Sequence, residues 1–198
     1  AEQLGYRIKL LGISKMRPDG VELRVHPTLV PADRLIANVE GAMNAVLVNG
    51  DAVGPTLYYG KGAGAEPTAS AVIADLVDVT RLHTADPEHR VPHLAFQADQ
   101  VRDVKVLPIE ETITSYYLRL RVDDKPGVLA DITRVLADSG ISIEALIQKQ
   151  AGEGESRTDI ILLTHRTVER NANTAIRQIE ALNVVHGPIR RLRVESLQ

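Results

Sequence analysis

The stretch "SYYLRLRVDDKPGVLADITRVLADSG", residues 115–140, decides the fold of the second half of the chain. Apolar residues stand at every second position from Tyr116 to Val122, which is the period of a half-buried strand. From Val128 to Leu136 the apolar residues follow helical spacing, and Gly140 supplies a stop. The stretch therefore predicts a strand, a turn at "DDKPG" and an amphipathic helix, in that order.

The rest of this block repeats the pattern. Residues 141–151 alternate as a strand, "GEGES" is a loop, and residues 157–165 form a continuous apolar strand of the kind covered by helices. A second helix over 169–182 and a last strand over 187–197 follow. The order β-α-β-β-α-β over about 85 residues predicts a ferredoxin-like sheet with two helices on one side.

The first block, residues 1–82, reads as a mostly antiparallel sheet closed by a helix. A strand over 6–15 and the turn "RPDG" lead into a strand over 21–30. That second strand alternates an apolar face with a polar one, so we expect it to be half-buried; the faces are Val21, Leu23 and Val25 against Glu22, Arg24 and His26. Asn49-Gly50 is a hairpin signal, and the helix over 67–82 has a broad apolar face. The fold class is α+β.

Residues 83–113 read as a linker between the two blocks, and the ferredoxin-like domain then spans 114–198. The segment holds three prolines and has one extended piece near 104–107. Its histidines, His83, His89 and His93, have no helical ligand spacing, so we interpret them as solvated and predict no metal site.

The composition narrows the function classes. A net charge of −3 and 3% aromatic residues favour neither nucleic acid nor a membrane surface as a partner. The absence of cysteine excludes disulfides and zinc–thiolate sites and favours a reducing compartment, the cytoplasm. The N-terminus has neither a signal-peptide pattern nor an initiator methionine, so we expect a processed or cut chain.

The bend "YYGKGAGAEPTAS" places glycine-rich backbone before a helix. Because Ala65 stands where the dinucleotide fingerprint G-x-G-x-x-G needs glycine, and no Gly-Lys-Ser/Thr follows, neither standard phosphate loop is present. The helix start, with Thr68 in its first turn, suits the polar or anionic end of a ligand. The alternative is a tight bend that packs a strand against a helix.

The loop "VDDKPGVLADI" offers charges of both signs at a helix start. The N–H groups of Val128 and Leu129 suit a carboxylate, and Asp123 or Asp124 suits an ammonium, so together they suit an amino acid. The alternative is an acidic turn with an N-capping aspartate. No nucleophile–base pair emerges, and we assign no catalytic residue.

The two blocks resemble a known family. Residues 38–79, "NVEGAMNAVLVNG" through "ASAVIADLVDV", closely resemble the end of the catalytic region of bacterial homoserine dehydrogenase, and residues 116–150 resemble an ACT domain. The resemblance implies a parent oxidoreductase that interconverts homoserine and aspartate 4-semialdehyde with NAD(P), in threonine and methionine biosynthesis. The family's Rossmann domain and catalytic lysine lie upstream, and Lys9, Lys15 and Lys61 do not match that lysine. We therefore expect a fragment that is inactive and binds no cofactor alone.

The resemblance also implies site residues. The cofactor-contacting glycine corresponds to Gly64, with Gly62, Ala65 and Thr68 as weaker candidates. The effector candidates are Asp123, Gly127, Val128 and Leu129 on the loop, Ser142 and Ile143 facing a partner's loop, and Gln148, which matches a position of threonine-sensing members. Residues 42–59 fall in the family's subunit interface, which implies a homo-dimer or higher homo-oligomer with threonine as the effector and allosteric regulation.

Two other interpretations remain open at this point. The chain would be a free-standing amino-acid-binding regulatory protein if the first block served only as a dimer scaffold. A self-sufficient nucleotide-dependent enzyme is disfavoured because the dinucleotide fingerprint is missing.

Overall fold

A computed structural model describes residues 1–83, 96–149, 152 and 154–197. The strands are β1 Tyr6–Arg17, β2 Gly20–Pro31, β3 Met43–Gly50, β4 Gly54–Lys61, β5 Ile113–Asp123, β6 Ile143–Gln148, β7 Arg157–Thr164, β8 Thr167–Val168 and β9 Arg190–Val194. The α-helices are α1 Ala65–His83, α2 Val128–Asp138 and α3 Glu169–Glu180, and the short turns are η1 Glu2–Leu4, η2 Leu35–Asn38, η3 Ala98–Gln100 and η4 Ile109–Glu111. The chain divides into a large unit, residues 1–33 with 104–198, and a small unit, residues 34–103.

The large unit is built on one sheet with the strand order β1-β2-β9-β5-β7-β6. Strands β9, β5, β7 and β6 pair antiparallel, as the β-α-β-β-α-β pattern predicts. All residues of β7 after Arg157 are buried, which confirms the predicted central strand. The α+β class and the ferredoxin-like module are therefore confirmed.

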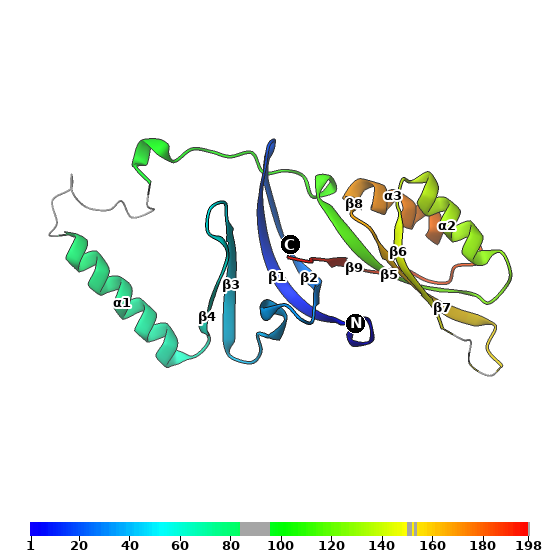
Figure 1. The fold of residues 1–198 in the computed structure, drawn as a ribbon, viewed down its shortest axis with the longest axis horizontal. Helices are drawn as coiled ribbons and strands as arrows, with labels where there is room; N and C mark the ends of the chain where they lie inside the picture. The colour runs from blue at the N-terminus through cyan, green and yellow to red at the C-terminus, as the bar shows by residue number, and fades with distance from the viewer. Residues whose placement is uncertain (84–95, 150–151, 153, 198) are drawn as a thin grey trace. The chain divides into compact units, whose positions relative to one another are not determined.

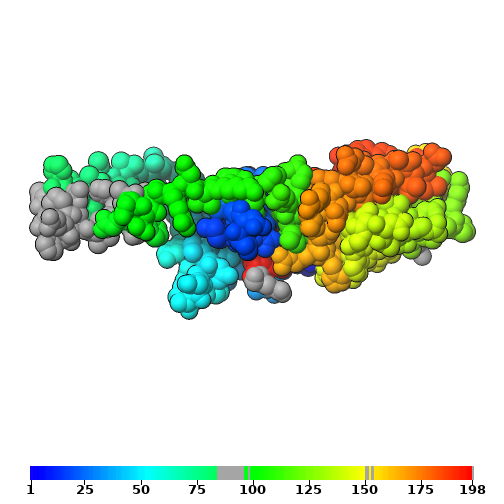
Figure 2. Space-filling view, turned by 90° about the horizontal axis from the view of Figure 1, so that it is seen from above, coloured from blue at the N-terminus to red at the C-terminus, as the bar shows by residue number. Residues whose placement is uncertain are grey.

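Two helices cover one face of this module. Both α2 and α3 lie on the same side of the sheet (Figure 1), and they lie side by side when the module is seen from above (Figure 2). The i, i+4 repeat of Val128, Ile132 and Leu136 turns one stripe of α2 toward the sheet. The core between the layers contains Tyr116, Leu118, Leu120, Val122, Ile160 and Leu162 from the strands, with Ala172, Ala175 and Ile179 from α3.

The N-terminal hairpin β1–β2 extends the same sheet. Its strands pair antiparallel from Tyr6 opposite Pro31 to Arg17 opposite Gly20. Strand β1 is thus two residues longer than the predicted strand over 6–15. Strand β2 then pairs parallel with β9, with Thr28 opposite Arg193 and Leu29 opposite Val194. The hairpin is thus a structural part of the C-terminal sheet.

The burial of β2 is the reverse of the expected one. Leu23 and Val25 are 53% and 74% exposed, whereas Glu22, Arg24 and His26 on the opposite face are buried. The reason is that Glu195, just after β9, packs against this polar face.

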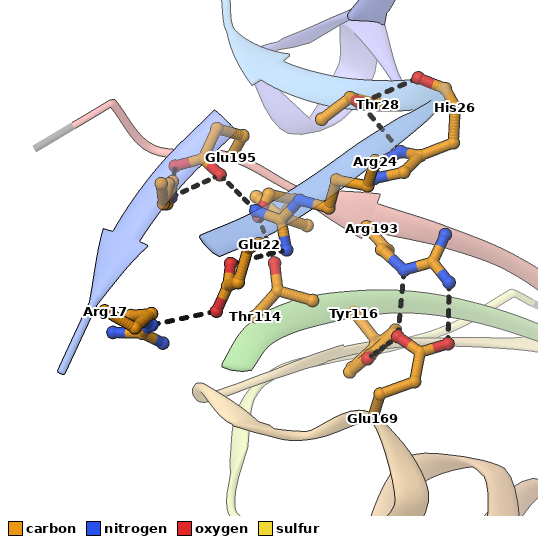
Figure 3. Close-up of polar contacts among 12 residues, drawn as sticks. Arg17, Glu22, Arg24, His26, Thr28, Thr114, Tyr116, Glu169, Arg193 and Glu195 are labelled. Atoms are coloured by element: carbon orange, nitrogen blue, oxygen red, sulfur yellow. Dashed lines mark hydrogen bonds and ion pairs between the residues drawn. The ribbon is translucent and has the colours of Figure 1, made fainter. Parts of the chain in front are cut away.

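Ion pairs neutralise the buried polar face of β2 (Figure 3). The Glu195 carboxylate accepts from Arg24 Nη2 at 2.8 Å and from Lys15 Nζ at 2.7 Å, and Arg17 Nε donates to Glu22 Oε1 at 2.9 Å. Charges at this depth are retained because each has an opposite partner.

The extended piece near 104–107 is confirmed. Val106 forms a parallel bridge with Val21. The Val21 N–H donates to the Lys105 carbonyl, and the Leu107 N–H donates to the Val21 carbonyl, both at 2.9 Å. This piece ties the segment before β5 to the start of β2.

The small unit holds the β3–β4 hairpin and α1. The predicted hairpin is present, but its turn differs from the predicted one. Asn49 and Gly50 still pair, with Pro55 and Gly54, and the chain reverses over residues 51–53. Gly54, at φ +73°, takes the left-handed conformation that closes this three-residue loop.

Helix α1 does not close a sheet as predicted. None of its residues is buried, and Leu76 and Val79 on its apolar side are exposed. An amphipathic pattern specifies a face that favours burial but not the surface that buries it. No described residue of the small unit covers the apolar side of α1.

The predicted domain boundaries, between the first block and the linker at 82/83 and between the linker and the ferredoxin-like domain at 113/114, stay predictions. Strands β1 and β2 pack with the C-terminal sheet. The compact units of the structure therefore do not coincide with the blocks predicted from the sequence, which placed these strands with residues 34–82. Of the predicted linker histidines, His83 ends α1, and His89 and His93 lie outside the described residues. Across the described ranges, the helices lack the combination of length and apolar character that a membrane crossing requires.

Candidate functional site

A groove of about 380 Å³ lies where β5 turns into α2. Its lining includes all four loop residues predicted from the sequence, Asp123, Gly127, Val128 and Leu129, and Gln148 from the end of β6. Val122, Asp124, Lys125, Pro126 and Ile160 complete the lining. The fold thus brings residues from two separate predicted elements to one place.

Hydrogen bonds to neighbouring segments hold the loop in place. The Asp123 N–H donates to the Val184 carbonyl and the Asp124 N–H to the Ser156 carbonyl, both at 2.9 Å. Gly127 then takes φ +95°, and a Cβ built there would meet no atom within 4 Å. Glycine is therefore favoured at this position by the left-handed backbone rather than by lack of space.

The start of α2 lacks a side-chain cap. Gly127 is the N-cap residue and no side chain bonds to the helix start, so the expected alternative of an N-capping aspartate is not what the structure has. The Val128 N–H, predicted to be unpaired, donates to the Lys125 carbonyl over a long 3.4 Å. Leu129 N–H has no acceptor among the described residues, so the positive end of the helix dipole opens onto the groove.

Asp123 carries negative charge at the edge of the same groove. Its Oδ1 lies 2.7 Å from His186 Nε2 and its Oδ2 lies 3.1 Å from Lys125 Nζ. The hydrogen bond with His186, followed by the one with Lys125, lowers the pKa of the Asp123 carboxyl below its ordinary value. Asp123 is therefore an ionised carboxylate at neutral pH.

His186 was missed by reasoning from the sequence. It stands 63 residues after Asp123, in the loop before β9, and no spacing connects the two. The fold joins them because Val185 bridges Val122 and the His186 N–H donates to the Arg121 carbonyl at 2.8 Å. Only the pairing of these segments could have revealed it.

Gln148 faces the loop from across the groove. Its Nε2 donates to Asp124 Oδ1 at 3.4 Å. Ser142 and Ile143 lie at the opposite end of β6, since Ile143 pairs with Thr164 and Gln148 with Ile160. Five residues of strand separate the two ends by roughly 17 Å. These two residues therefore do not join the groove of their own chain, and they remain candidates only for contact with a second copy.

The glycine bend between β4 and α1 carries the candidate cofactor residues. Gly64 has φ +123°, and its carbonyl accepts both the Thr68 N–H at 3.2 Å and the Thr68 hydroxyl at 2.7 Å. A Cβ at Gly62 would collide with the Asn44 side-chain amide. Thr68 thus bonds inside the chain, whereas the clash at Gly62 involves only the end of the exposed Asn44 side chain. Gly64 and Ala65 are exposed, so they fit a cofactor only as one open backbone edge of a site.

A buried cluster of Glu169, Arg193 and Tyr116 lies in the large unit (Figure 3), and its members bond to one another instead of facing a groove. Glu169 accepts from Arg193 Nε at 2.9 Å and Nη2 at 2.6 Å, and from the Tyr116 hydroxyl. Burial raises the pKa of Glu169, but the bonds from Arg193 and Tyr116 outweigh it and the pKa is lowered. Burial and the Glu169 carboxylate raise the pKa of Tyr116. These saturated contacts join α3 to the sheet and leave no group free for chemistry.

The fold and the site define the class of the C-terminal part first. It is a ferredoxin-like βαββαβ module with an uncapped helix start and an ionised carboxylate on one groove, and its sheet is extended by an N-terminal hairpin.

Comparisons with known proteins then show what the two parts of the chain resemble. The family profile described as homoserine dehydrogenase matches residues 1–77, and the one described as ACT domain matches residues 116–183. The chain is 59% identical to homoserine dehydrogenase of Pseudomonas aeruginosa and 57% identical to that of Neisseria gonorrhoeae, each over 197 residues and 100% of this chain. The chain is thus a fragment with a homoserine dehydrogenase domain over residues 1–77 and an ACT domain over residues 116–183. It spans about 45% of the length of these curated relatives.

A solved structure agrees with this assignment. The crystal structure of a homoserine dehydrogenase from Thiobacillus denitrificans is 68% identical, with a TM-score of 0.91, over 100% of this chain and 44% of that one. A homoserine dehydrogenase of Staphylococcus aureus, at pH 7.0, is 26% identical with a TM-score of 0.58.

Proposed function

We propose that the chain is the dimerising and amino-acid-sensing C-terminal portion of a homoserine dehydrogenase. The parent enzyme would interconvert homoserine and aspartate 4-semialdehyde with NAD(P), in threonine and methionine biosynthesis. The two family matches and the 45% coverage of the relatives support this assignment. The observation that carries the sensing role is the uncapped start of α2 beside ionised Asp123.

The two charges of the groove suit the two ends of a free amino acid. An α-carboxylate would accept the Leu129 N–H at the positive end of α2. An α-ammonium would lie against the Asp123 carboxylate, where a charge-assisted hydrogen bond is about twice as strong as a neutral one. A volume of about 380 Å³ is in the range of small-molecule sites.

Threonine is the effector we propose. The Gln148 amide reaches the groove from β6 and offers both a donor and an acceptor to a side-chain hydroxyl. Its present partner, Asp124 Oδ1, lies at the long distance of 3.4 Å, so a ligand hydroxyl competes with a weak bond.

We also propose that this chain alone does not catalyse the parent reaction. Hydride transfer needs a bound cofactor facing a positioned substrate, and the bend at Gly64 offers only a backbone contact to NAD(P). Lys15 is committed to Glu195, whose two oxygens it contacts at 2.7 and 2.8 Å. Measurable homoserine oxidation by the purified 198-residue chain would contradict this proposal.

Exposed apolar surface supports a homo-dimer or higher homo-oligomer. In the large unit, Leu10, Met16 and Val25 are exposed on the uncharged face of the hairpin. In the small unit, Val46 and Tyr58 are exposed on β3 and β4. Large apolar patches of this kind mark interaction sites, and sedimentation equilibrium would measure the assembly directly.

Calorimetric titration with threonine tests the sensing role. Gly127→Asp places a negative charge at the helix start where the ligand carboxylate would bind. Gly140→Asp is a matched control, since Gly140 stands beyond the other end of the same helix, also has positive φ and also borders open space.

We expect saturable binding in the original chain and in Gly140→Asp, and none in Gly127→Asp. A flat titration of the folded original chain, or equal loss in both variants, would count against threonine sensing.

A further inference from the structure

A second groove, of about 550 Å³, lies beside α3 in the large unit. Helix α3, the η4 turn and the segment around β9 line it, and it shares no residue with the groove at the β5–α2 turn. The polar side chains that line it include Glu110, Arg170, Asn173, Arg177 and Arg191.

Positive charge dominates this groove. Three arginines line it against the single carboxylate of Glu110, in a chain whose net charge is −3. Arg170 and Arg177 stand seven residues apart on α3 and therefore project from the same face. Neither guanidinium forms an ion pair with any of the described residues. A local excess of positive charge in a concave site attracts anions.

Arg191 is held in position beside them. Its Nη1 donates to the Asn173 side-chain oxygen and lies 3.4 Å from Glu169 Oε1. The two Glu169 oxygens already accept from Arg193 at 2.6 and 2.9 Å, and one also accepts from Tyr116. Arg191 is therefore oriented but only partly neutralised, which reduces the entropy it would lose on binding an anion.

We propose that this groove binds a small phosphorylated molecule, a role beyond the amino-acid sensing described above. Planar guanidinium groups present paired N–H donors that match phosphate oxygens. Because the Asn173 oxygen is occupied by Arg191, its NH₂ group remains as a further donor. The groove volume is in the range of sites for small metabolites.

Calorimetric titration of the 198-residue chain with pyrophosphate, at ionic strength held constant with sodium chloride, tests the proposal. The test variant is Arg170→Gln with Arg177→Gln, which leaves the anchored Arg191 in place. Arg134→Gln on α2, also an exposed helical arginine, is the matched control. Circular dichroism confirms that each variant is folded.

We expect saturable binding of pyrophosphate that weakens at least about tenfold in the double variant, since each lost bond to a charged group is worth at least that factor. Arg134→Gln should bind as the original chain does, and threonine titration should be unchanged in both variants. Absence of saturable binding would overturn the proposal, as would equal weakening in Arg134→Gln. Succinate binding as tight as pyrophosphate would also overturn it, because the site would then select carboxylates.

Discussion

Replacing Glu169 by glutamine should destabilise the large unit strongly. Glutamine keeps the shape of the side chain but removes the charge that neutralises Arg193. The side chain of Arg193 is only 13% exposed and that of Glu169 only 2% exposed. The arginine would therefore be left charged in a site largely shielded from water. Removing one partner of a buried ion pair costs about 3–5 kcal/mol.

An exposed pair in the large unit, between β5 and the loop before β7, provides the comparison. Arg121 Nη2 and Glu155 Oε2 are 2.5 Å apart, but their side chains are 42% and 52% exposed. Water screens such a pair, and its loss costs about 0–1 kcal/mol. Glu155→Gln makes the same chemical change as Glu169→Gln and should leave stability nearly unchanged.

Urea unfolding followed by circular dichroism measures both variants. With a slope of about 1–3 kcal/mol per molar urea, the Glu169→Gln midpoint should fall by roughly 1 M or more. At the same slope, the fall for Glu155→Gln should be at most about a third as large. Equal shifts in the two variants, or a loss below about 1 kcal/mol for Glu169→Gln, would refute the view that the buried triad joins α3 to the sheet.

Three further predictions concern the core, pH and the groove. Leu162→Ala, at a residue with 0% exposure, should cost about 2–5 kcal/mol in urea unfolding, whereas Leu76→Ala, 57% exposed on α1, should cost less than about 0.5 kcal/mol. The pKa of Glu169 is lowered in the folded state, so its contribution to stability holds above its unfolded pKa of about 4.5 and is lost as pH falls through the folded pKa. The pKa of Tyr116 is raised in the folded state, so its contribution holds below about pH 10 and is lost as pH rises through the folded pKa. Unfolding titrations in acid and in alkali measure these two contributions. Asp123→Asn should weaken threonine binding in calorimetry at least about tenfold without unfolding the chain.

The ferredoxin-like module could be predicted because its local patterns agree with its packing. The alternation from Tyr116 to Val122 and the helical spacing from Val128 to Leu136 are both periods set by the element itself. The groove residues of the loop followed for the same reason, since they lie within a few positions of a predicted helix start.

The joining of the hairpin to the module could not be predicted in this way. Thr28 pairs in parallel with Arg193, a residue at the other end of the sequence, and no local period encodes such a distant partner. The polar face of β2 is buried for the same reason, because Glu195 neutralises Arg24 from the far end of the sequence. His186 joined the candidate site only through the pairing of its loop with the end of β5.

The apolar face of α1 shows a related limit. Periodicity correctly predicted a helix there, but it does not identify what covers Leu76 and its neighbours. The hairpin turn after Gly50 was misplaced because a three-residue loop closed by Gly54 competes with the two-residue turn that Asn49-Gly50 favours.

Amide hydrogen exchange measured by NMR, with and without threonine, tests the central claim most directly. The Leu129 N–H has no acceptor among the described residues, so a ligand carboxylate bound at the start of α2 would give it one. We predict that threonine slows exchange at Leu129 at least about tenfold and shifts the resonances of Gly127 and Gln148, with little change in β3 and β4. Unchanged exchange at Leu129 under saturating threonine, or protection confined to other parts of the chain, would contradict the assignment of this groove as the amino-acid site.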